Sequence, residues 1–537
     1  MKHIYAIGLI GSMSLLTACS GGGTTEDNST SGNGSGSGGT TDTTLQWTQN
    51  QFSPEVDFFA RCANPRSGIN PATDQAYPDQ AGSTEYEQFW LRSWANNSYL
   101  WYDEVTDKNP ADFSTITDYY AQLKTTATTA SGNDKDNFHF LLDTETWQGM
   151  TTSGSSLSYG INFVIIDGTI PRNILVKDTE PSANIDNVKR GYKLVAINDV
   201  DVVNTNSQSD IDLINAALNP QSNNESYQFT FEVPNTGNDM QVTLAAAEIT
   251  VSPVKNVKTL TTEQGKIGYL QFDTFIQTSE KALYDAFTQL KNENISELVL
   301  DLRYNGGGYL AISSQLAYMI ASQAKMEGKF FEKTIFNDKH TVTDPITGQT
   351  IVPLDFIDTA VGFSLEANTP LPNLGLERVY VLTTDNTCSA SEALMNGLRG
   401  IDIEVIQIGS TTCGKPYGFY PTDNCGITYF NIQFEGINAK NFGSYSDGFT
   451  PSNNPQVEGV SVPGCVVADD FEHQLGDSNE AMLSAALNYQ ATGTCPVISM
   501  SAVNYGLKNQ DSNTATSDLE VKLTPSTQQQ LFNNKLQ

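Results

Sequence analysis

The chain has 537 residues, 38% of them hydrophobic, and a formal net charge of −32 from 29 basic and 61 acidic side chains. This length is too great for one hydrophobic core, and the hydrophobic content is too high for a disordered protein, so we expect several folded domains. The negative charge repels phosphate backbones and anionic lipid surfaces, which excludes nucleic acid as an expected partner.

The N-terminus has the pattern of a secretory signal: a basic start precedes an apolar run over residues 4–16 that is too short to span a bilayer. The run ends in Leu16-Thr17-Ala18-Cys19, which resembles a bacterial lipobox. The resemblance implies cleavage before Cys19 and diacylation of its sulfur, and two or three acyl chains anchor a protein stably. An ordinary signal peptide is the alternative. We assign residues 1–19 to a lipoprotein signal and the Gly-, Ser- and Thr-rich residues 20–46 to a disordered tether.

Six cysteines remain once Cys19 is set aside, an even number in a chain with an export signal. They are Cys62, Cys388, Cys413, Cys425, Cys465 and Cys495. Disulfides are therefore expected, but six cysteines allow 15 complete pairings and their spacing does not choose among them.

A small helical domain is expected over residues 47–150. Apolar side chains recur there at helical spacing, first Tyr86, Phe89, Trp90 and Trp94, then Phe113, Ile116, Tyr119, Tyr120 and Leu123. Aromatic residues at this period form a core far more often than a binding surface, so no chemistry is assigned to them.

Residues 151–255 change to short β-type runs separated by turn signals. The runs cover residues 161–166, 174–176, 193–197, 227–232 and 241–245. The segments Tyr159–Phe163, Glu180–Ala183 and Arg190–Asn198, in this order, resemble a protease-associated PDZ domain. The resemblance implies that backbone amides of Gly160, Ile161, Asn162 and Phe163 bind a peptide carboxylate while the peptide adds a strand to the sheet. Asn162 and Lys193 depart from the family pattern, and a β-rich spacer without a ligand is the alternative.

Strands and helices alternate over residues 256–495, which indicates an α/β layer arrangement. The predicted strands are 267–272, 298–302, 379–383 and 405–408, and helices are predicted over 280–290, up to about residue 321, and from Ala390 onward. Residues 496–537 are rich in Ser, Thr, Asn and Gln without a sustained period, and we treat them as a polar extension.

The strongest local signal for chemistry is Thr387-Cys388-Ser389-Ala390-Ser391-Glu392, where a buried strand has ended and a helix begins. A serine at such a junction presents its hydroxyl at a turn, and the free amides of the first helical turn point toward a developing oxyanion. Taken alone, the segment is an N-cap, with Glu392 completing a capping box.

Lys415 follows the strand that comes one helix after Ser389, so its loop returns to the same edge of the sheet. A lysine acts as a base only when it is uncharged, which requires burial. Taken alone, a Gly-Lys pair is a solvated loop lysine.

The third signal is Asp301-Leu302-Arg303-Tyr304-Asn305-Gly306-Gly307-Gly308, between a strand and a helix. Its glycines let the backbone approach a bound carbonyl closely. Phosphate binding is disfavoured because neither a Walker lysine nor a dinucleotide fingerprint accompanies it.

Together, D-L-R-x-N-G-G-G, S-A-S-E and T-x-G-K, in this order, resemble the carboxyl-terminal processing (tail-specific) serine peptidases over about residues 100–491, here as a PDZ-containing bacterial lipoprotein. The resemblance implies a crotonase-like ββα catalytic domain within a multidomain α/β (α+β) chain. It also implies Ser389 as nucleophile, Lys415 as general base, and the amides of Gly307 and Ala390 as the oxyanion hole.

Two features depart from the family. Phe419 stands where many members have a glutamine that assists the lysine, so the group that orients Lys415 is open. Cys388 and Cys413 flank the dyad that the resemblance implies, and we hypothesise that they form a disulfide.

Two rival catalytic residues were considered. Cys388 would need a histidine or an electropositive setting to become a thiolate, and no histidine lies near it in sequence. His139 is a rival base, as in tricorn-type proteases, although a structural role is favoured. No set of residues has the spacing of zinc ligands, so neither a metal nor a cofactor is expected.

The sequence therefore predicts an exported serine endopeptidase that uses a Ser-Lys dyad on proteins or peptides and recognises substrate C-termini through its PDZ-like domain. The expected location is the cell envelope, by a lipid anchor on Cys19. The competing functions are a peptide- or hydrophobic-ligand-binding lipoprotein, since this fold also occurs in retinoid-binding proteins, and an adaptor with a degenerate catalytic domain.

Overall fold

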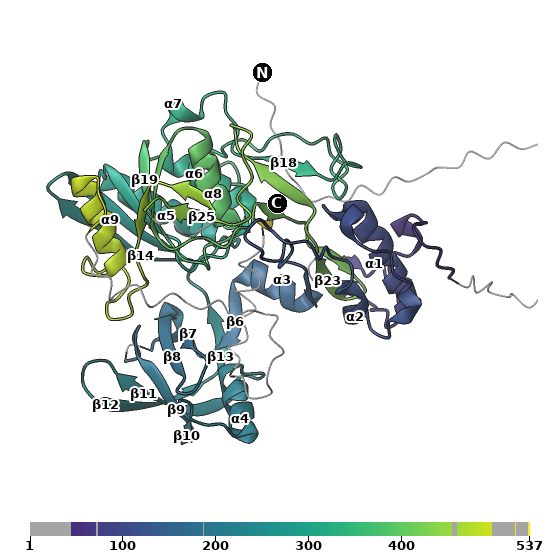
Figure 1. Cartoon of the computed structure of the whole chain (residues 1–537), viewed down its shortest axis with the longest axis horizontal. Helices are drawn as coiled ribbons and strands as arrows, with labels where there is room; N and C mark the ends of the chain where they lie inside the picture. Colours follow the sequence, from purple (N-terminus) through teal and green to yellow (C-terminus); the bar gives the residue numbers. More distant parts are fainter. Residues whose placement is uncertain are drawn as a thin grey trace, which may run out of the picture. The chain divides into compact units, whose positions relative to one another are not determined.

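The structure, a computed structural model, describes residues 45–70, 73–185, 187–453, 459–496, 521 and 535–536. The expected signal over residues 1–19 with Cys19, nearly all of the tether over 20–46 and most of the extension over 496–537 lie outside the described residues. The chain from Thr48 onward forms one compact unit (Figure 1). Within the described ranges, no helix is long and apolar enough to cross a membrane.

The N-terminal region is built around α1 (Thr84–Ser98). The Ser83 hydroxyl caps this helix by accepting a hydrogen bond from the Tyr86 amide, and α2 (Ile116–Tyr120) packs against it. Phe89, Trp90, Trp94, Tyr119 and Tyr120 are buried, which confirms that the aromatic stripe is core. The other elements here are η1 (Glu55–Asp57), β1 (Arg61–Cys62), β2 (Ile69–Asn70), β3 (Gln75–Ala76), β4 (Gln80–Ala81), η2 (Tyr102–Glu104), η3 (Pro110–Asp112), β5 (Phe140–Asp143) and α3 (Thr144–Ser153).

The expectation of a helical domain over 47–150 is only partly met, because this region also contains strands that pair with distant parts of the chain. Strand β5 pairs with β23 (Ile427–Phe430), which in turn pairs with β22 (Thr422–Asn424). A disulfide between Cys62 and Cys425 makes a second connection. Helical periodicity was visible in the sequence, whereas the β5–β23 pairing and the disulfide join residues more than 280 positions apart and leave no local pattern.

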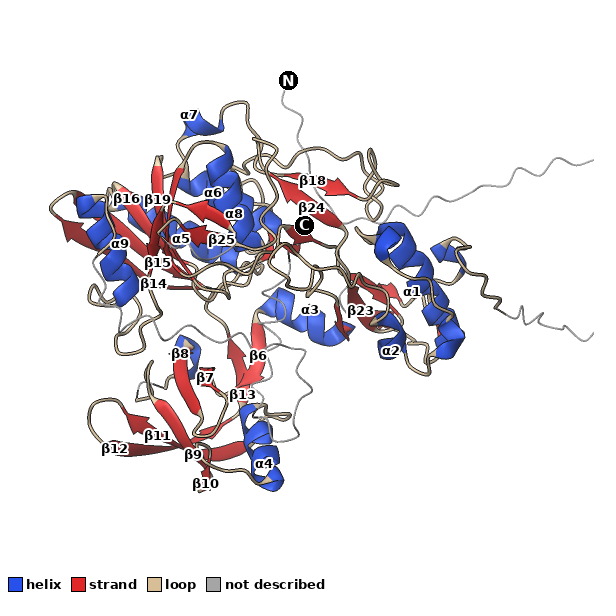
Figure 2. Cartoon of the chain, in the orientation of Figure 1, coloured by secondary structure: helices blue, strands red, loops and turns tan. Residues whose placement is uncertain are grey.

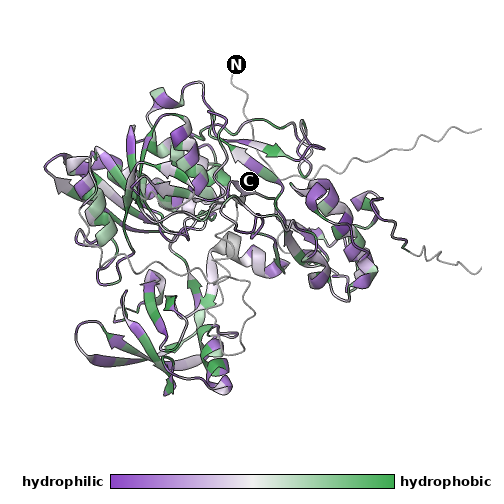
Figure 3. Ribbon diagram, in the orientation of Figure 1, coloured by the Kyte–Doolittle hydropathy of each residue, from purple (hydrophilic) through white to green (hydrophobic). Residues whose placement is uncertain are grey.

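The region over 151–255 forms a small sheet with strand order β12-β11-β9-β8-β7, and β10 pairs with β9. Its elements are β7 (Ile161–Asp167), β8 (Asn173–Thr179), η4 (Pro181–Ala183), β9 (Lys193–Ile197), β10 (Val200–Asp201), α4 (Gln208–Leu218), β11 (Ser226–Val233) and β12 (Asn238–Ala245). Ile174, Val176, Leu194, Ile211 and Phe229 form its core together with Val521, a residue of the expected extension. Figure 3 shows largely hydrophobic strands in this sheet and a hydrophilic start of β12. Beside the sheet, β6 (Ser155–Ser158) pairs with β13 (Ala247–Thr250).

The region over 256–495 contains a large sheet with strand order β14-β15-β16-β19-β20-β27. Strand β14 is antiparallel to β15, and the remaining neighbours are parallel. The elements are β14 (Val254–Thr262), β15 (Gly265–Phe272), α5 (Ser279–Asn292), β16 (Glu297–Asp301), β17 (Gly308–Tyr309), α6 (Leu310–Ile320), α7 (Gln323–Met326), β19 (Arg378–Thr383), α8 (Ala390–Gly400), β20 (Glu404–Gly409), β27 (Gly464–Val466) and α9 (Ala481–Thr492). The observed alternation agrees with the elements predicted here.

Helices cover both faces of the large sheet (Figure 2). Side chains alternate across a strand, so Leu298 and Leu300 of β16 pack in one core with residues of α5, α6 and α8. Val299 of β16 packs in the other core, with α9. This burial on both faces explains why the central strands read as continuous apolar runs.

Smaller sheets surround the carboxyl ends of these strands. They contain β18 (Lys333–Phe336), β24 (Phe434–Ile437) and β21 (Tyr417–Gly418) in one set, and β25 (Phe449–Pro451) with β26 (Val460–Val462) in another. Strand β28 (Lys535–Leu536) pairs in parallel with β17.

Candidate active site

Ser389 lies at the turn between β19 and α8, at the carboxyl edge of the large sheet. Its backbone has φ 58° and ψ −113°, a conformation that non-glycine residues rarely adopt and that tends to occur at functional sites. The residue is fully buried. Its hydroxyl is buried and has no hydrogen-bond partner among the described residues.

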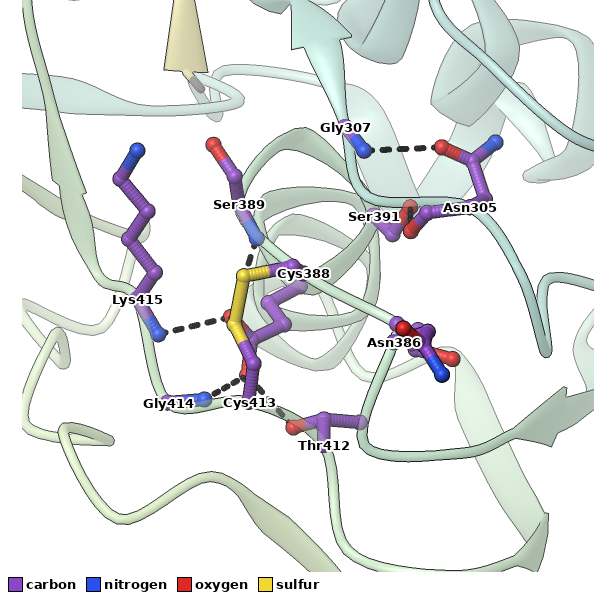
Figure 4. The surroundings of a disulfide bond; sticks show 12 residues. Asn305, Gly307, Asn386, Cys388, Ser389, Ser391, Thr412, Cys413, Gly414 and Lys415 are labelled. Atoms are coloured by element: carbon purple, nitrogen blue, oxygen red, sulfur yellow. Dashed lines mark hydrogen bonds between the residues drawn. A yellow bond between two sulfur atoms is a disulfide. The ribbon is translucent and has the colours of Figure 1, made fainter. Parts of the chain in front are cut away.

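Lys415 lies in the loop that follows β20, the strand next to β19 in the sheet. Its side chain is also fully buried, which rules out the solvated loop lysine considered from the sequence. Figure 4 shows the Lys415 and Ser389 side chains pointing in the same direction, and the backbone amides of both residues donate to the same Glu392 oxygen. The structure therefore brings together the two residues that the sequence singled out.

A disulfide joins Cys388 to Cys413 and so links the serine turn to the lysine loop (Figure 4). This confirms the hypothesised pairing and removes Cys388 as a rival nucleophile, because a disulfide sulfur is not a thiolate. The third disulfide joins Cys465 and Cys495. The Glu392 carboxylate lies close enough to Cys388 and Cys413 to complete a metal-binding cluster, but sulfurs bonded to each other do not act as thiolate ligands.

Glu392 makes a second link between the two loops. One carboxylate oxygen accepts hydrogen bonds from the amide of Ser389 at 3.0 Å and from the amide of Lys415 at 2.8 Å. The other accepts from the amide of Gly414 at 2.9 Å and from the Thr412 hydroxyl. Burial raises the pKa of Glu392 above its ordinary value, and these hydrogen bonds oppose the shift. The sequence had placed Glu392 only in a helix cap, so its bridging role was missed.

The glycine loop approaches the serine turn through Asn305. The Asn305 carbonyl accepts hydrogen bonds from the Cys388 amide at 3.0 Å and from the Ser391 hydroxyl at 2.9 Å. Gly308 has φ +132°, and a Cβ there would lie 2.4 Å from the Phe275 carbonyl oxygen. Glycine is therefore required where this loop runs beside Phe275.

The two predicted oxyanion donors differ in their present partners. Ala390 is the first residue of α8, so its amide has no acceptor within the helix. The amide of Gly307 donates to the Asn305 side-chain oxygen at 2.9 Å (Figure 4). The Gly307 amide can therefore donate to an oxyanion only when the Asn305 side chain moves away and this hydrogen bond breaks. The sequence did not reveal this condition.

Arg303 of the same motif anchors the loop to the rest of the region. Its buried guanidinium pairs with Asp301, Asp469 and Glu480. Burial by itself would lower the pKa of Arg303, and the charges of these carboxylates outweigh that effect and raise it. Arg190, from the small-sheet region, joins the cluster through Asp469. The D-L-R part of the motif thus has a structural explanation, since a buried cation needs several acceptors.

The residues predicted for the peptide-binding loop lie at the start of β7, at the edge of the small sheet. Ile161 and Asn162 pair with β8, and the opposite edge of β7 is not paired within the described residues. The Asn162 amide group donates to Asp178 at 2.7 Å and to Glu180 at 3.2 Å. A Cβ on Gly160 would lie 2.2 Å from the Cβ of Ala183, so Gly160 serves packing, while Phe163 continues β7.

His139 is not placed as a base. Its Nε2 lies 2.9 Å from the Tyr120 carbonyl oxygen, and its ring stacks on Tyr120 with centroids 3.9 Å apart. Burial lowers the pKa of His139. These contacts support the structural role that the sequence analysis favoured.

Replacing His139 by Phe should reduce the loss of stability in acid. Because the folded-state pKa is depressed, the unfolded chain binds a proton on His139 first as the pH falls below about 6.5. The free energy of unfolding then falls by up to about 1.4 kcal/mol per pH unit from this group, until the folded-state pKa is reached. His139→Phe keeps the ring stack but lacks this contribution. Denaturant titrations between pH 7.5 and 5 measure the difference, and parallel curves for both proteins would contradict it.

Part of the chain is similar to known peptidases. Residues 266–419 match the sequence profile of peptidase family S41. A chloroplastic C-terminal processing peptidase of Tetradesmus obliquus is 24% identical over 276 residues, which are 49% of this chain and 52% of the relative. Carboxyl-terminal-processing peptidase 2 of Arabidopsis thaliana chloroplasts is 28% identical over 178 residues, 32% of this chain and 29% of the relative.

The fold has a solved counterpart. The crystal structure of a putative S41 protease from Bacteroides fragilis superposes with a TM-score of 0.57 at 22% identity and covers 78% of this chain and 98% of that one. This shows a similar mixed α/β multidomain fold. The chain spans about half or less of the length of the curated relatives that it matches. Residues 266–419, which carry the glycine loop, Ser389 and Lys415, are thus similar to peptidase family S41.

Proposed function

We propose that the chain is a serine endopeptidase with Ser389 as nucleophile and Lys415 as general base. One observation carries the proposal: the loops that hold the buried Ser389 hydroxyl and the buried Lys415 side chain are joined by the Cys388–Cys413 disulfide and by Glu392. Such pre-organisation of nucleophile and base is what acyl transfer requires.

In the proposed reaction, the Lys415 amine accepts the Ser389 proton as the hydroxyl oxygen attacks the peptide carbonyl carbon. The amides of Ala390 and, once released from Asn305, Gly307 stabilise the tetrahedral anion. The C–N bond breaks as Lys415 returns the proton to the leaving amine, which leaves an ester on Ser389. Water then attacks the ester and gives its proton to Lys415, and the Ser389 oxygen leaves with that proton.

We further propose that the small sheet is a PDZ-like domain that takes substrate C-termini, and that the large sheet belongs to a crotonase-like catalytic domain. The edge position of β7 supports the first idea, because an unpaired edge can accept a peptide strand. The lipobox-like segment ending at Cys19 and the disulfides support an exported, lipid-anchored protein of the cell envelope.

The test is to incubate the purified protein and its Ser389→Ala variant with an unfolded protein such as casein, and with peptides whose C-termini are free or amidated. The wild type should cleave the unfolded protein and be labelled by a fluorophosphonate, and Ser389→Ala should do neither. Preference for the free carboxylate would support the PDZ-like role. Equal cleavage by both proteins would refute the dyad. Peptide binding without cleavage by the wild type would favour the non-catalytic alternative.

A further inference from the structure

The amine of Lys415 lies between two aromatic rings. Its Nζ atom is 4.7 Å from the centre of the Phe419 ring and 4.6 Å from the centre of the Phe138 ring. Phe419 comes directly after β21 and is fully buried. Phe138 comes from the N-terminal region, 277 positions upstream (415 − 138). Two distant parts of the chain therefore enclose the amine.

A buried network holds Phe138 in this place. The Asp136 carboxylate accepts hydrogen bonds from the Phe138 amide at 2.9 Å and from the Tyr99 hydroxyl at 2.6 Å. The Tyr99 oxygen accepts from the Thr125 amide at 3.0 Å, and Lys124 donates to the Asp136 carbonyl at 3.0 Å. Asp136 is only 1% exposed, so the turn that presents Phe138 is itself part of the core.

The rings affect the amine in two opposing ways. A ring face attracts an ammonium ion, with about 0.5–2 kcal/mol in favour of the charged form. The rings also exclude water, and removing water from a charged group costs several kcal/mol. The second effect is larger, so the two rings by themselves contribute in favour of the uncharged amine that a general base needs.

We propose that Phe138 is a positioning residue for the reaction, and that it closes a water-free box around the Lys415 amine. The inference rests on the proposed function. The N-terminal region would then complete the surroundings of the catalytic base. Phe138 touches the base and not the substrate, so it acts through Lys415.

The ionisable groups around this box limit how its pH dependence is interpreted. Glu392 faces the Lys415 backbone, and Asp136 holds Phe138. Tyr417, two residues after Lys415, feels the charges of Glu435, Asp136 and Asp447, and burial raises its pKa above the working range. A variant that leaves these groups in place therefore reports on the enclosure of Lys415.

The experiment compares Phe138→Ala with Phe138→Leu by measuring kcat and KM for one peptide between pH 6 and pH 10. Phe138→Ala admits water and stabilises the ammonium form. We expect kcat/KM at pH 7 to fall at least about tenfold. The low-pH side of the plot of kcat/KM against pH should move to higher pH by about one unit or more, so that activity recovers at high pH. The loss should appear in kcat, with KM little changed. Phe138→Leu excludes water and should keep most of the activity.

Phe113→Ala is the matched control, because Phe113 is a half-buried ring of the same region that packs on Tyr119. It should leave the pH profile unmoved. Should Phe138→Ala fail to fold, Phe138→Val removes the ring while keeping a smaller apolar side chain and gives the same readout at smaller size. An unchanged profile, or a loss that is equal at every pH, overturns the inference. An inactive wild type or an active Ser389→Ala overturns the proposed function instead, so the two failures are distinguishable.

Discussion

Replacing Lys415 by alanine is expected to lower kcat by about 10³- to 10⁴-fold, with little change in KM. Removal of the base leaves the Ser389 hydroxyl with its proton, and general-base catalysis contributes on this order. Binding of the peptide backbone does not involve the amine, so substrate affinity should persist. Initial rates on a chromogenic peptide, with the folded state checked by circular dichroism, measure the effect.

Lys415→Arg is the informative control. The guanidinium is a basic group of similar reach, but it is not deprotonated in proteins. It should therefore be as inactive as Lys415→Ala at every pH. If Lys415→Arg retained substantial activity, a permanently charged side chain would suffice at this position and the role of base would be wrong.

Glu392→Ala should affect both stability and catalysis. The substitution leaves the buried amides of Ser389, Gly414 and Lys415 without their acceptor. Each unsatisfied buried donor costs about 1–3 kcal/mol, so we expect the free energy of unfolding to fall by about 3–5 kcal/mol. Because the two loops lose a shared anchor, kcat/KM should fall by about 10²-fold.

Glu392→Gln tests whether the acceptor or the charge matters. The glutamine side chain keeps one oxygen, which can still accept hydrogen bonds from some of the backbone amides that now donate to Glu392. Burial already disfavours the charged form of the carboxylate. Glu392→Gln should therefore lose less stability than Glu392→Ala in urea titrations. If Glu392→Ala were as stable and active as the wild type, the bridge would be dispensable and the disulfide alone would hold the loops.

The individual elements around the site were predictable because their signals are local. The strand over 405–408 and the helix starting at Ala390 follow from periodicity, and parallel strands with short crossovers bring their exit loops to one edge. That rule placed Lys415 near Ser389. The capping box also pointed to Glu392, although only as the partner of its own helix.

Other features of the site depend on contacts between distant segments. The motif around residues 136–140 attracted attention because of His139, yet it is the neighbouring Phe138 that reaches Lys415. A phenylalanine side chain carries no reactive group that would indicate a functional role. Nothing in the sequence indicates that Phe138 and Lys415, which are 277 positions apart, lie in contact. Similarly, the hydrogen bond from Gly307 to Asn305 depends on a side-chain orientation that packing decides.

By itself, the sequence determined the order of strands and helices, the motifs and the residue types available for chemistry, because these depend on local periodicity and turn preferences. The tertiary structure alone decided the water-free surroundings of Lys415, the bridge made by Glu392, the pairing of the cysteines and the strands that join the N-terminal region to β23. The physical reason is that burial and long-range hydrogen bonds are properties of the packed chain, where segments hundreds of residues apart exclude water from one another.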